Sequence, residues 1–175
     1  MEEIDFSTAL ARLLSDTSLR EQFARDPAAI AAQIRVREAD REAFVMLSAA
    51  EIETQARILL RKRFKAVGSL IPATMDRLGP AAWDCFLEHA RLCWPQGPAM
   101  EVEDTRLLCA HLAVTQPAAL CQSELNRLRF HLSNQRLAVH WVRDLRVRGK
   151  VRRALQVLVR QGRGWSEHSL YWSLG

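Results

Sequence analysis

Residues 134–175 decide the fold that the sequence predicts: NQRLAVHWVRDLRVRGKVRRALQVLVRQGRGWSEHSLYWSLG. Val, Leu, Trp and Tyr are frequent in this stretch, Arg recurs every few residues, and glycines stand at Gly149, Gly162 and Gly164. β-Branched and aromatic runs bounded by glycine are typical of strands. LQVLVRQ and WSEHSLYWSL, separated by Gly-Arg-Gly, therefore predict two strands joined by a short turn. We expect a small antiparallel sheet over residues 137–174.

The preceding 133 residues have the apolar spacing of amphipathic helices. Breaks are predicted near Ser48, at the weak point Gly68, at Pro72 and within 94–98, and new starts at Asp26-Pro27, Gly79-Pro80 and Gln116-Pro117. The expected helices are 6–14, 16–25, 27–34, 39–65, 67–78, 81–94, 104–114 and 117–132. The predicted fold class is α+β: a helical domain over 1–133, with a strand-rich region over 134–175 packed on it.

Composition favours one globular domain with a small appendage. The chain has 175 residues, 49% of them hydrophobic, which is enough for a core. No apolar run approaches the roughly 18 to 20 residues that cross a bilayer. The acidic start MEEIDFSTAL lacks the features of a signal peptide. We expect a cytoplasmic protein that has no membrane partner and four reduced cysteines.

Charge is distributed unevenly along the chain. The net charge is +5, yet residues 1–60 hold seven basic and eleven acidic side chains, whereas residues 131–175 hold nine basic and two acidic ones. A basic C-terminal end favours an anionic partner: nucleic acid, an acidic peptide or an acidic protein face. The alternative is that these arginines only keep a sheet face soluble.

The spacing Cys85-x3-His89-x3-Cys93 could direct three metal ligands along one helix face, with His111 or Cys109 as a fourth. Three such ligands span about 12 Å of helix axis, so one ion could not bind both Cys85 and Cys93 without distortion. A hydrogen-bonded core histidine is the simpler interpretation, and a small metal-binding helical protein stays an alternative. HExxH, a glycine-rich phosphate loop and a dinucleotide fingerprint are absent from the sequence, and we expect no catalytic activity.

Helices followed by a basic hairpin also describe the winged-helix layout of DNA-binding proteins. The basic side chains that could meet phosphates are Arg143, Arg146, Arg148, Lys150, Arg152, Arg153, Arg160 and Arg163. However, the preceding helix, 117–132, has only Arg127 and Arg129, whereas a recognition helix carries more polar base-reading residues. Nucleic acid is therefore the less favoured partner, and DNA binding is kept as an alternative.

A sheet with an open edge offers a third possibility, because it can accept an extended peptide as an additional strand. The run LAVHWVRDLRVR at 137–148 would suit such an edge, unless it pairs only with its neighbours or with a second subunit. Trp141 would serve as an apolar anchor. The residues predicted to contact the peptide are Val139, Trp141, Arg143, Arg146 and Arg148, with Leu155 and Val157 behind them.

Scattered positions across residues 10–115 carry a family resemblance. They are Phe23-x2-Asp26-Pro27, Gln55-Ala56-x2-Leu59-x2-Lys62-Arg63, Val67, Leu70, Pro72, Leu78-Gly79, Trp83, Phe86, Ala90, Trp94-Pro95-x-Gly97 and Asp104. This set resembles the small accessory proteins of multinuclear non-heme iron-dependent oxidative (MNIO) enzymes. Those enzymes modify Cys-containing precursor peptides in ribosomal peptide natural-product biosynthesis, as in methanobactin-type and thiaglutamate-type pathways.

The resemblance implies a non-catalytic partner subunit that forms a heterodimer with a barrel-shaped iron oxidase and helps it to hold the precursor peptide. Iron would be bound by the oxidase, and this chain would have no cofactor of its own. The expected oxidase-docking residues are Gln55, Lys62 and Arg63. Some relatives have an acidic residue or His after the Trp-Pro-x-Gly segment. This chain has Pro98, Ala99, Met100 and Glu101 there, which leaves that loop without an assigned role.

Overall fold

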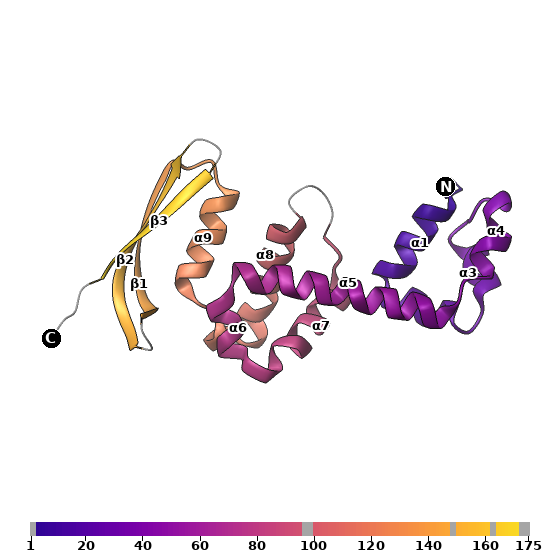
Figure 1. Cartoon of the computed structure of the whole chain (residues 1–175), viewed down its shortest axis with the longest axis horizontal. Coiled ribbons are helices and arrows are strands. Elements are labelled where there is room, and N and C mark those ends of the chain that lie inside the picture. Colours follow the sequence, from indigo (N-terminus) through magenta and orange to yellow (C-terminus); the bar gives the residue numbers. More distant parts are fainter. Residues whose placement is uncertain (1–2, 96–99, 148–149, 162–163, 172–175) are drawn as a thin grey trace. The chain divides into compact units, whose positions relative to one another are not determined.

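A computed structural model describes residues 3–95, 100–147, 150–161 and 164–171 of the chain. Within these residues the fold is α+β, as the sequence predicted: helices are followed by a C-terminal antiparallel sheet (Figure 1). The helices are α1 (Phe6–Ser15), α2 (Thr17–Phe23), α3 (Pro27–Gln33), α4 (Glu38–Val45), α5 (Ala49–Leu70), α6 (Pro72–Leu78), α7 (Ala82–Leu92), α8 (Met100–Thr115) and α9 (Gln122–Leu132), with 3₁₀ turns η1 (Gly79–Ala81) and η2 (Pro117–Ala119).

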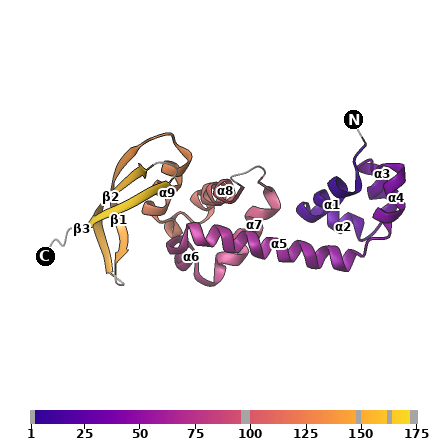
Figure 2. The same cartoon turned by 45° about the horizontal axis from the view of Figure 1, so that its top comes forward.

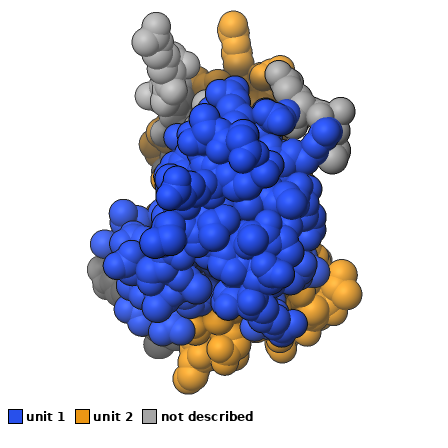
Figure 3. All heavy atoms as spheres, turned by 90° about the vertical axis from the view of Figure 1, so that its right-hand side faces the viewer, with its two compact units in different colours: residues 1–65, 90–94 blue, residues 66–89, 95–175 orange. Residues whose placement is uncertain are grey.

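The chain divides into two compact units, which Figure 3 shows in different colours. Unit 1 comprises residues 1–65 and 90–94, and unit 2 comprises residues 66–89 and 95–175. The sequence placed a boundary at residue 133, where composition changes. In the structure, α6, α8 and α9 belong to the same unit as the sheet.

Unit 1 begins with three short helices, each capped by the aspartate before it. The carboxylates of Asp5, Asp16 and Asp26 accept hydrogen bonds from the backbone N–H three residues later, at 2.8, 3.0 and 2.9 Å. Capping of this kind satisfies N–H groups that have no partner inside the helix. The helix start that the sequence predicted at Asp26-Pro27 is therefore confirmed.

The core of unit 1 joins residues from all four short helices and α5. Phe23 and Phe44 meet edge to face with ring centroids 5.3 Å apart. Arg20, only 6% exposed, donates hydrogen bonds to the carbonyl oxygens of Leu13 and Leu14 and to Glu53 Oε2. The last turn of α1 is thereby tied to α5 through one buried guanidinium.

Several predicted helix boundaries are wrong. The helix predicted over 104–114 begins earlier, at Met100. Helix α5 continues through Gly68 and ends at Leu70, because glycine costs a helix only about 1 kcal/mol whereas Ile71 precedes a proline and leaves the helical region (φ −132°, ψ 53°). The predicted helix 117–132 is also interrupted. Leu120 and Cys121 are extended, and they separate η2 from α9.

Helices α6 and α9 of unit 2 are joined by a buried carboxylate. Glu124 of α9 is 1% exposed, and it accepts hydrogen bonds from the backbone N–H groups of Ala73 (2.7 Å) and Thr74 (2.9 Å) and from the Thr74 hydroxyl (2.7 Å). The N-terminus of a helix carries unpartnered N–H groups and a partial positive charge. Glu124 therefore caps α6 from a position about fifty residues away in the sequence.

Candidate peptide-binding surface

Three strands form the C-terminal sheet: β1 (Leu137–Val147), β2 (Lys150–Gln161) and β3 (Gly164–Tyr171). Their order is β1-β2-β3, and both neighbouring pairs are antiparallel. Among the described residues, β1 is thus an edge strand. The three predicted strand segments are confirmed over the described residues, whereas residues 148 and 172–174, which the sequence included in them, lie outside the described residues.

Helix α9 packs on one face of this sheet, against β1 and β2 (Figure 2). Four residues that point to that face are buried: Ala138 is 9% exposed, and Val142, Ala154 and Leu158 are 0% exposed. Leu158 and Ala138 form a core cluster with Phe130 of α9. Because strand side chains alternate between two faces, the intervening residues of β1 point to the opposite, outer face.

The outer face of β1 is apolar and exposed. Leu137, Val139 and Trp141 are 59%, 52% and 50% exposed. Large apolar side chains that stand together at a surface mark interaction sites more often than isolated ones do. Val139 and Trp141 were predicted from the sequence. Leu137 was not, although its i, i+2, i+4 spacing with them is visible in the sequence.

Strand pairing brings two further predicted residues to the same face. Val139 pairs with Val157, and Trp141 pairs with Leu155, so Leu155 and Val157 of β2 stand beside the exposed β1 residues. Both are half-buried. Residues directly opposite in an antiparallel pair lie on the same face with Cβ atoms about 5 Å apart. Val139, Trp141, Leu155 and Val157 therefore form one apolar patch, which we call the outer patch together with Leu137.

Basic residues lie at the end of this patch. The β1–β2 register shifts between Val142 and Leu145, which marks a bulge. Arg143 lies in this bulge of β1 and is exposed. Arg153 on β2 is exposed as well. The backbone of Arg146 pairs with Val151. The side chain of Arg146 and the whole of Arg148 lie outside the described residues.

Polar contacts hold the sheet firmly on α9. Gln156, 1% exposed, accepts a hydrogen bond from Asn126 Nδ2 (3.0 Å) and donates one to the Ser123 carbonyl oxygen (2.9 Å). Arg160 donates to the carbonyl oxygens of Phe130 (2.9 Å) and Ser133 (2.7 Å) at the end of α9. Sequence reasoning assigned Arg160 to possible phosphate contacts, whereas its guanidinium completes the C-terminus of a helix.

The three predicted oxidase-docking residues lie on α5 and differ in exposure. Gln55 and Lys62 are exposed. Arg63 is 8% exposed, its guanidinium lies 4.4 Å from the Trp94 ring centroid, and it donates a hydrogen bond to the Cys93 carbonyl oxygen at 3.4 Å. Arg63 is thus a packing residue of unit 1.

His89, the centre of the predicted Cys-His-Cys line, is a buried residue of α7. Its Nε2 lies 2.9 Å from Asp104 Oδ1 on α8, and both side chains are 3% exposed or less. This pairing agrees with a hydrogen-bonded core histidine. His111, considered as a fourth ligand, has its Nε2 3.8 Å from Glu88 Oε2.

Two cysteine thiols of unit 2 are poor nucleophiles. Burial raises the pKa of Cys109 to about 12, with a smaller contribution from the Glu124 carboxylate. Burial, followed by the charges of Glu88 and Asp84, also raises the pKa of Cys85. Because the thiolate is the reactive form, both thiols stay protonated near neutral pH.

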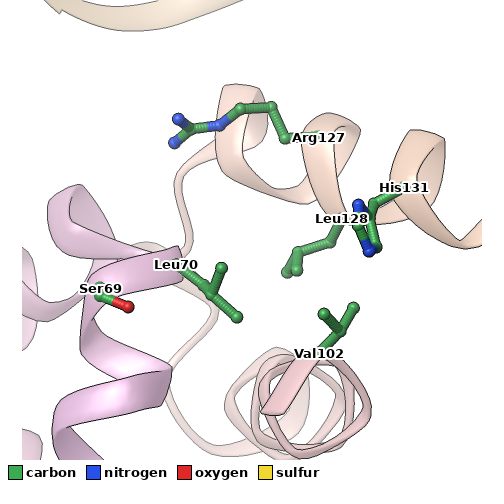
Figure 4. Close-up of a pocket in the computed structure, with 6 residues that line it drawn as sticks. All are labelled: Ser69, Leu70, Val102, Arg127, Leu128 and His131. Carbon is green, nitrogen blue, oxygen red and sulfur yellow. The ribbon is translucent and has the colours of Figure 1, made fainter. Parts of the chain in front are cut away.

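A pocket of about 230 Å³ in unit 2 lies between the end of α5, α8 and α9 (Figure 4). Leu70, Val102 and Leu128 point toward one another across it, whereas the Arg127 guanidinium extends away from them. Catalytic pockets bring several polar groups to one point. The side chains that line this pocket do not converge in this way, and its lining is mainly apolar.

The winged-helix alternative would require α9 to offer a polar face to DNA. Five of its residues are buried instead: Ser123, Glu124, Asn126, Leu128 and Phe130. Four of these five make the contacts with α6 and the sheet described above: Ser123, Glu124, Asn126 and Phe130. The exposed basic side chains among the described residues of α9 are Arg129 and His131, fewer than a recognition helix normally presents.

Comparisons with protein families, with curated proteins and with solved structures gave no match for this chain. Among the described helices, none has the length and apolar character needed to cross a membrane.

Proposed function

We propose that this protein is a non-catalytic partner subunit that recognises the leader segment of a Cys-containing precursor peptide and presents it to an iron-dependent oxidase. The observation that carries the proposal is the outer patch on an edge strand. Leu137, Val139 and Trp141 are each at least half exposed, and the opposite face of the same strand is packed on α9. A strand of this kind offers backbone hydrogen-bonding groups and apolar side chains together.

The regular part of the β1 edge, to which a peptide strand could pair, is short. From Leu137 to Val142 the β1–β2 register is regular, and the bulge follows. Six residues of strand span about 20 Å. A bound peptide would therefore add about six residues, with apolar side chains at alternate positions over the outer patch. Acidic side chains near its end would face Arg143 and Arg153, because both guanidiniums are exposed at the bulge.

The proposal assigns the iron and the oxidation to the partner enzyme. The MNIO resemblance suggested this division of labour from different residues, which lie mainly in the helices.

A direct test is calorimetric titration of the purified protein with the leader segment of the short Cys-containing precursor encoded beside the oxidase gene. We expect saturable binding that weakens between about 50 mM and 500 mM salt, because the salt screens the arginine–carboxylate attraction. At low salt, the Arg143→Glu variant should bind the leader more weakly than the wild-type protein does.

The matched control peptide has the same leader sequence with each Asp and Glu replaced by Lys. Its binding should be lost at low salt. No binding of the natural leader at low salt, or equal binding of the control peptide, contradicts the proposed recognition.

A further inference from the structure

The hydrogen bonds between β1 and β2 determine which backbone groups of β1 face its open edge. The Arg160 N–H donates to the Arg136 carbonyl oxygen at 2.9 Å, and the same register continues through Leu137–Val142. In an antiparallel ladder, pairs that exchange hydrogen bonds alternate with pairs that do not. The even-numbered residues of this segment therefore direct their N–H and C=O groups to β2. The odd-numbered residues direct theirs to the open edge: Leu137, Val139 and Trp141.

Helix α9 runs parallel to β2 on the inner face of the sheet, which is the face opposite the outer patch. Asn126 donates a hydrogen bond to Gln156, and Phe130, about one turn later in α9, packs with Leu158. The two contacts advance together along α9 and β2, so the helix and the strand have the same direction.

The handedness of strand and helix then places Arg129 beside the open edge. In a strand of L-residues, side chains that point up to α9 belong to residues whose backbone groups point to one fixed side. When β2 runs away from the viewer with α9 above it, that side is the right, and β1 lies there. A right-handed helix turns clockwise in this view. The residue before the sheet-facing Phe130 is Arg129, and it therefore points right, toward the edge of β1.

The surroundings of α9 agree with this placement. Arg127 and His131 line one pocket, whereas Leu125 and Arg129 line another, as expected for opposite flanks of the helix. Arg129 is exposed, and the salt bridges found within the described residues do not include it. Its flank of α9 thus presents a cation beside β1.

A peptide strand added to β1 would turn its side chains alternately to two environments. One set would lie over the outer patch, and the intervening set would lie on the inner face, beside Arg129. We infer that Arg129 binds an acidic side chain of the peptide, opposite Ala138 or His140, so that the bound segment alternates apolar with acidic residues. The position follows from the packing of Phe130 with Ala138. The inference rests on the proposed function in assigning this segment to a leader.

The same geometry distinguishes an acidic peptide from a second copy of the chain. The two-fold antiparallel pairing of β1 with its copy that matches the outer patches is centred on Val139 and sets Leu137 opposite Trp141. The α9 helices of both copies would then turn their Arg129 flanks to each other. Like charges that meet at an interface oppose association, whereas an acidic strand neutralises Arg129.

The test uses synthetic nine-residue peptides, with binding followed by fluorescence anisotropy at about 50 mM salt. In one peptide Glu alternates with Val, and in its partner Lys replaces each Glu. The wild-type protein should bind the Glu-Val peptide saturably and the Lys-Val peptide at least about tenfold more weakly. Arg129→Gln should weaken binding of the Glu-Val peptide about threefold, and Arg129→Glu about tenfold. Arg129→Glu should also bind the Lys-Val peptide more tightly than the wild type does.

Arg57→Glu is the matched control, because it makes the same change of charge at an exposed residue of unit 1. It should leave both affinities unchanged. The inference is overturned if the wild type does not bind the Glu-Val peptide, or if both Arg129 variants bind the two peptides as the wild type does. Circular dichroism confirms that each variant is folded.

Titration with the natural leader separates this inference from the proposed function. Wild-type binding of the leader with no effect of either Arg129 variant overturns the role of Arg129 and leaves the proposed function standing. Arg129-dependent binding of the Glu-Val peptide without any binding of the leader does the reverse.

Sedimentation of the protein alone tests the second copy as occupant. A monomer is the expected result. Self-association that Val139→Lys abolishes would show that β1 pairs with itself, and it would overturn the acidic peptide as the partner that this edge selects.

Discussion

Replacement of Glu124 by Ala should lower the free energy of unfolding by about 3 to 5 kcal/mol. The Glu124 carboxylate is buried and accepts three hydrogen bonds at the N-terminus of α6. Its removal leaves the N–H groups of Ala73 and Thr74 without these acceptors. Water cannot readily replace the carboxylate, because Thr74 is only 1% exposed. Urea unfolding followed by circular dichroism measures the change.

Glu103→Ala is the matched control for this prediction. Glu103 also forms an ion pair, with Arg106 at 2.6 Å, but the side chains of Glu103 and Arg106 are 37% and 47% exposed. Exposed pairs contribute at most about 1 kcal/mol. The account of α6 is contradicted if the two substitutions destabilise the protein equally.

Replacement of Trp141 by Ala should weaken leader binding at least about thirtyfold. Trp141 stands in the outer patch, opposite Leu155, and half of its surface is exposed. Aromatic side chains in such positions dominate binding energies because they bury a large area on association. Calorimetry with the same leader peptide gives the affinity.

Val114→Ala provides the comparison, because Val114 is an apolar side chain of α8 that is 84% exposed and lies outside the sheet. Its substitution should change neither stability nor leader affinity measurably. If Trp141→Ala binds the leader as the wild type does, the outer patch is not the site of recognition.

Local features of the fold were predictable from the sequence. Asp5, Asp16 and Asp26 cap helices because each acts on N–H groups three residues away. The alternation of Leu137, Val139 and Trp141 with buried Ala138 and Val142 follows from the period of a strand. Such patterns depend on neighbours in the sequence, and for that reason they can be recognised without a structure.

Contacts between distant residues were not predictable. Nothing in the sequence around Glu124 or Thr74 indicates that the two side chains meet, and the burial of Arg63 against Trp94 depends equally on tertiary packing. The MNIO resemblance illustrates the same limit. Phe23, Ala56 and Val67 are all 1% exposed or less, so positions of this kind reflect how the helices pack and carry little information about a ligand.

The most direct test of the central claim is amide hydrogen exchange with and without the leader peptide. Edge-strand amides that do not face β2 exchange freely until another strand pairs with them. We predict that the peptide slows exchange within Leu137–Val142 and leaves the amides of α9 unchanged. Slowed exchange confined to other segments, with Leu137–Val142 unaffected at saturating peptide, would contradict recognition by β1.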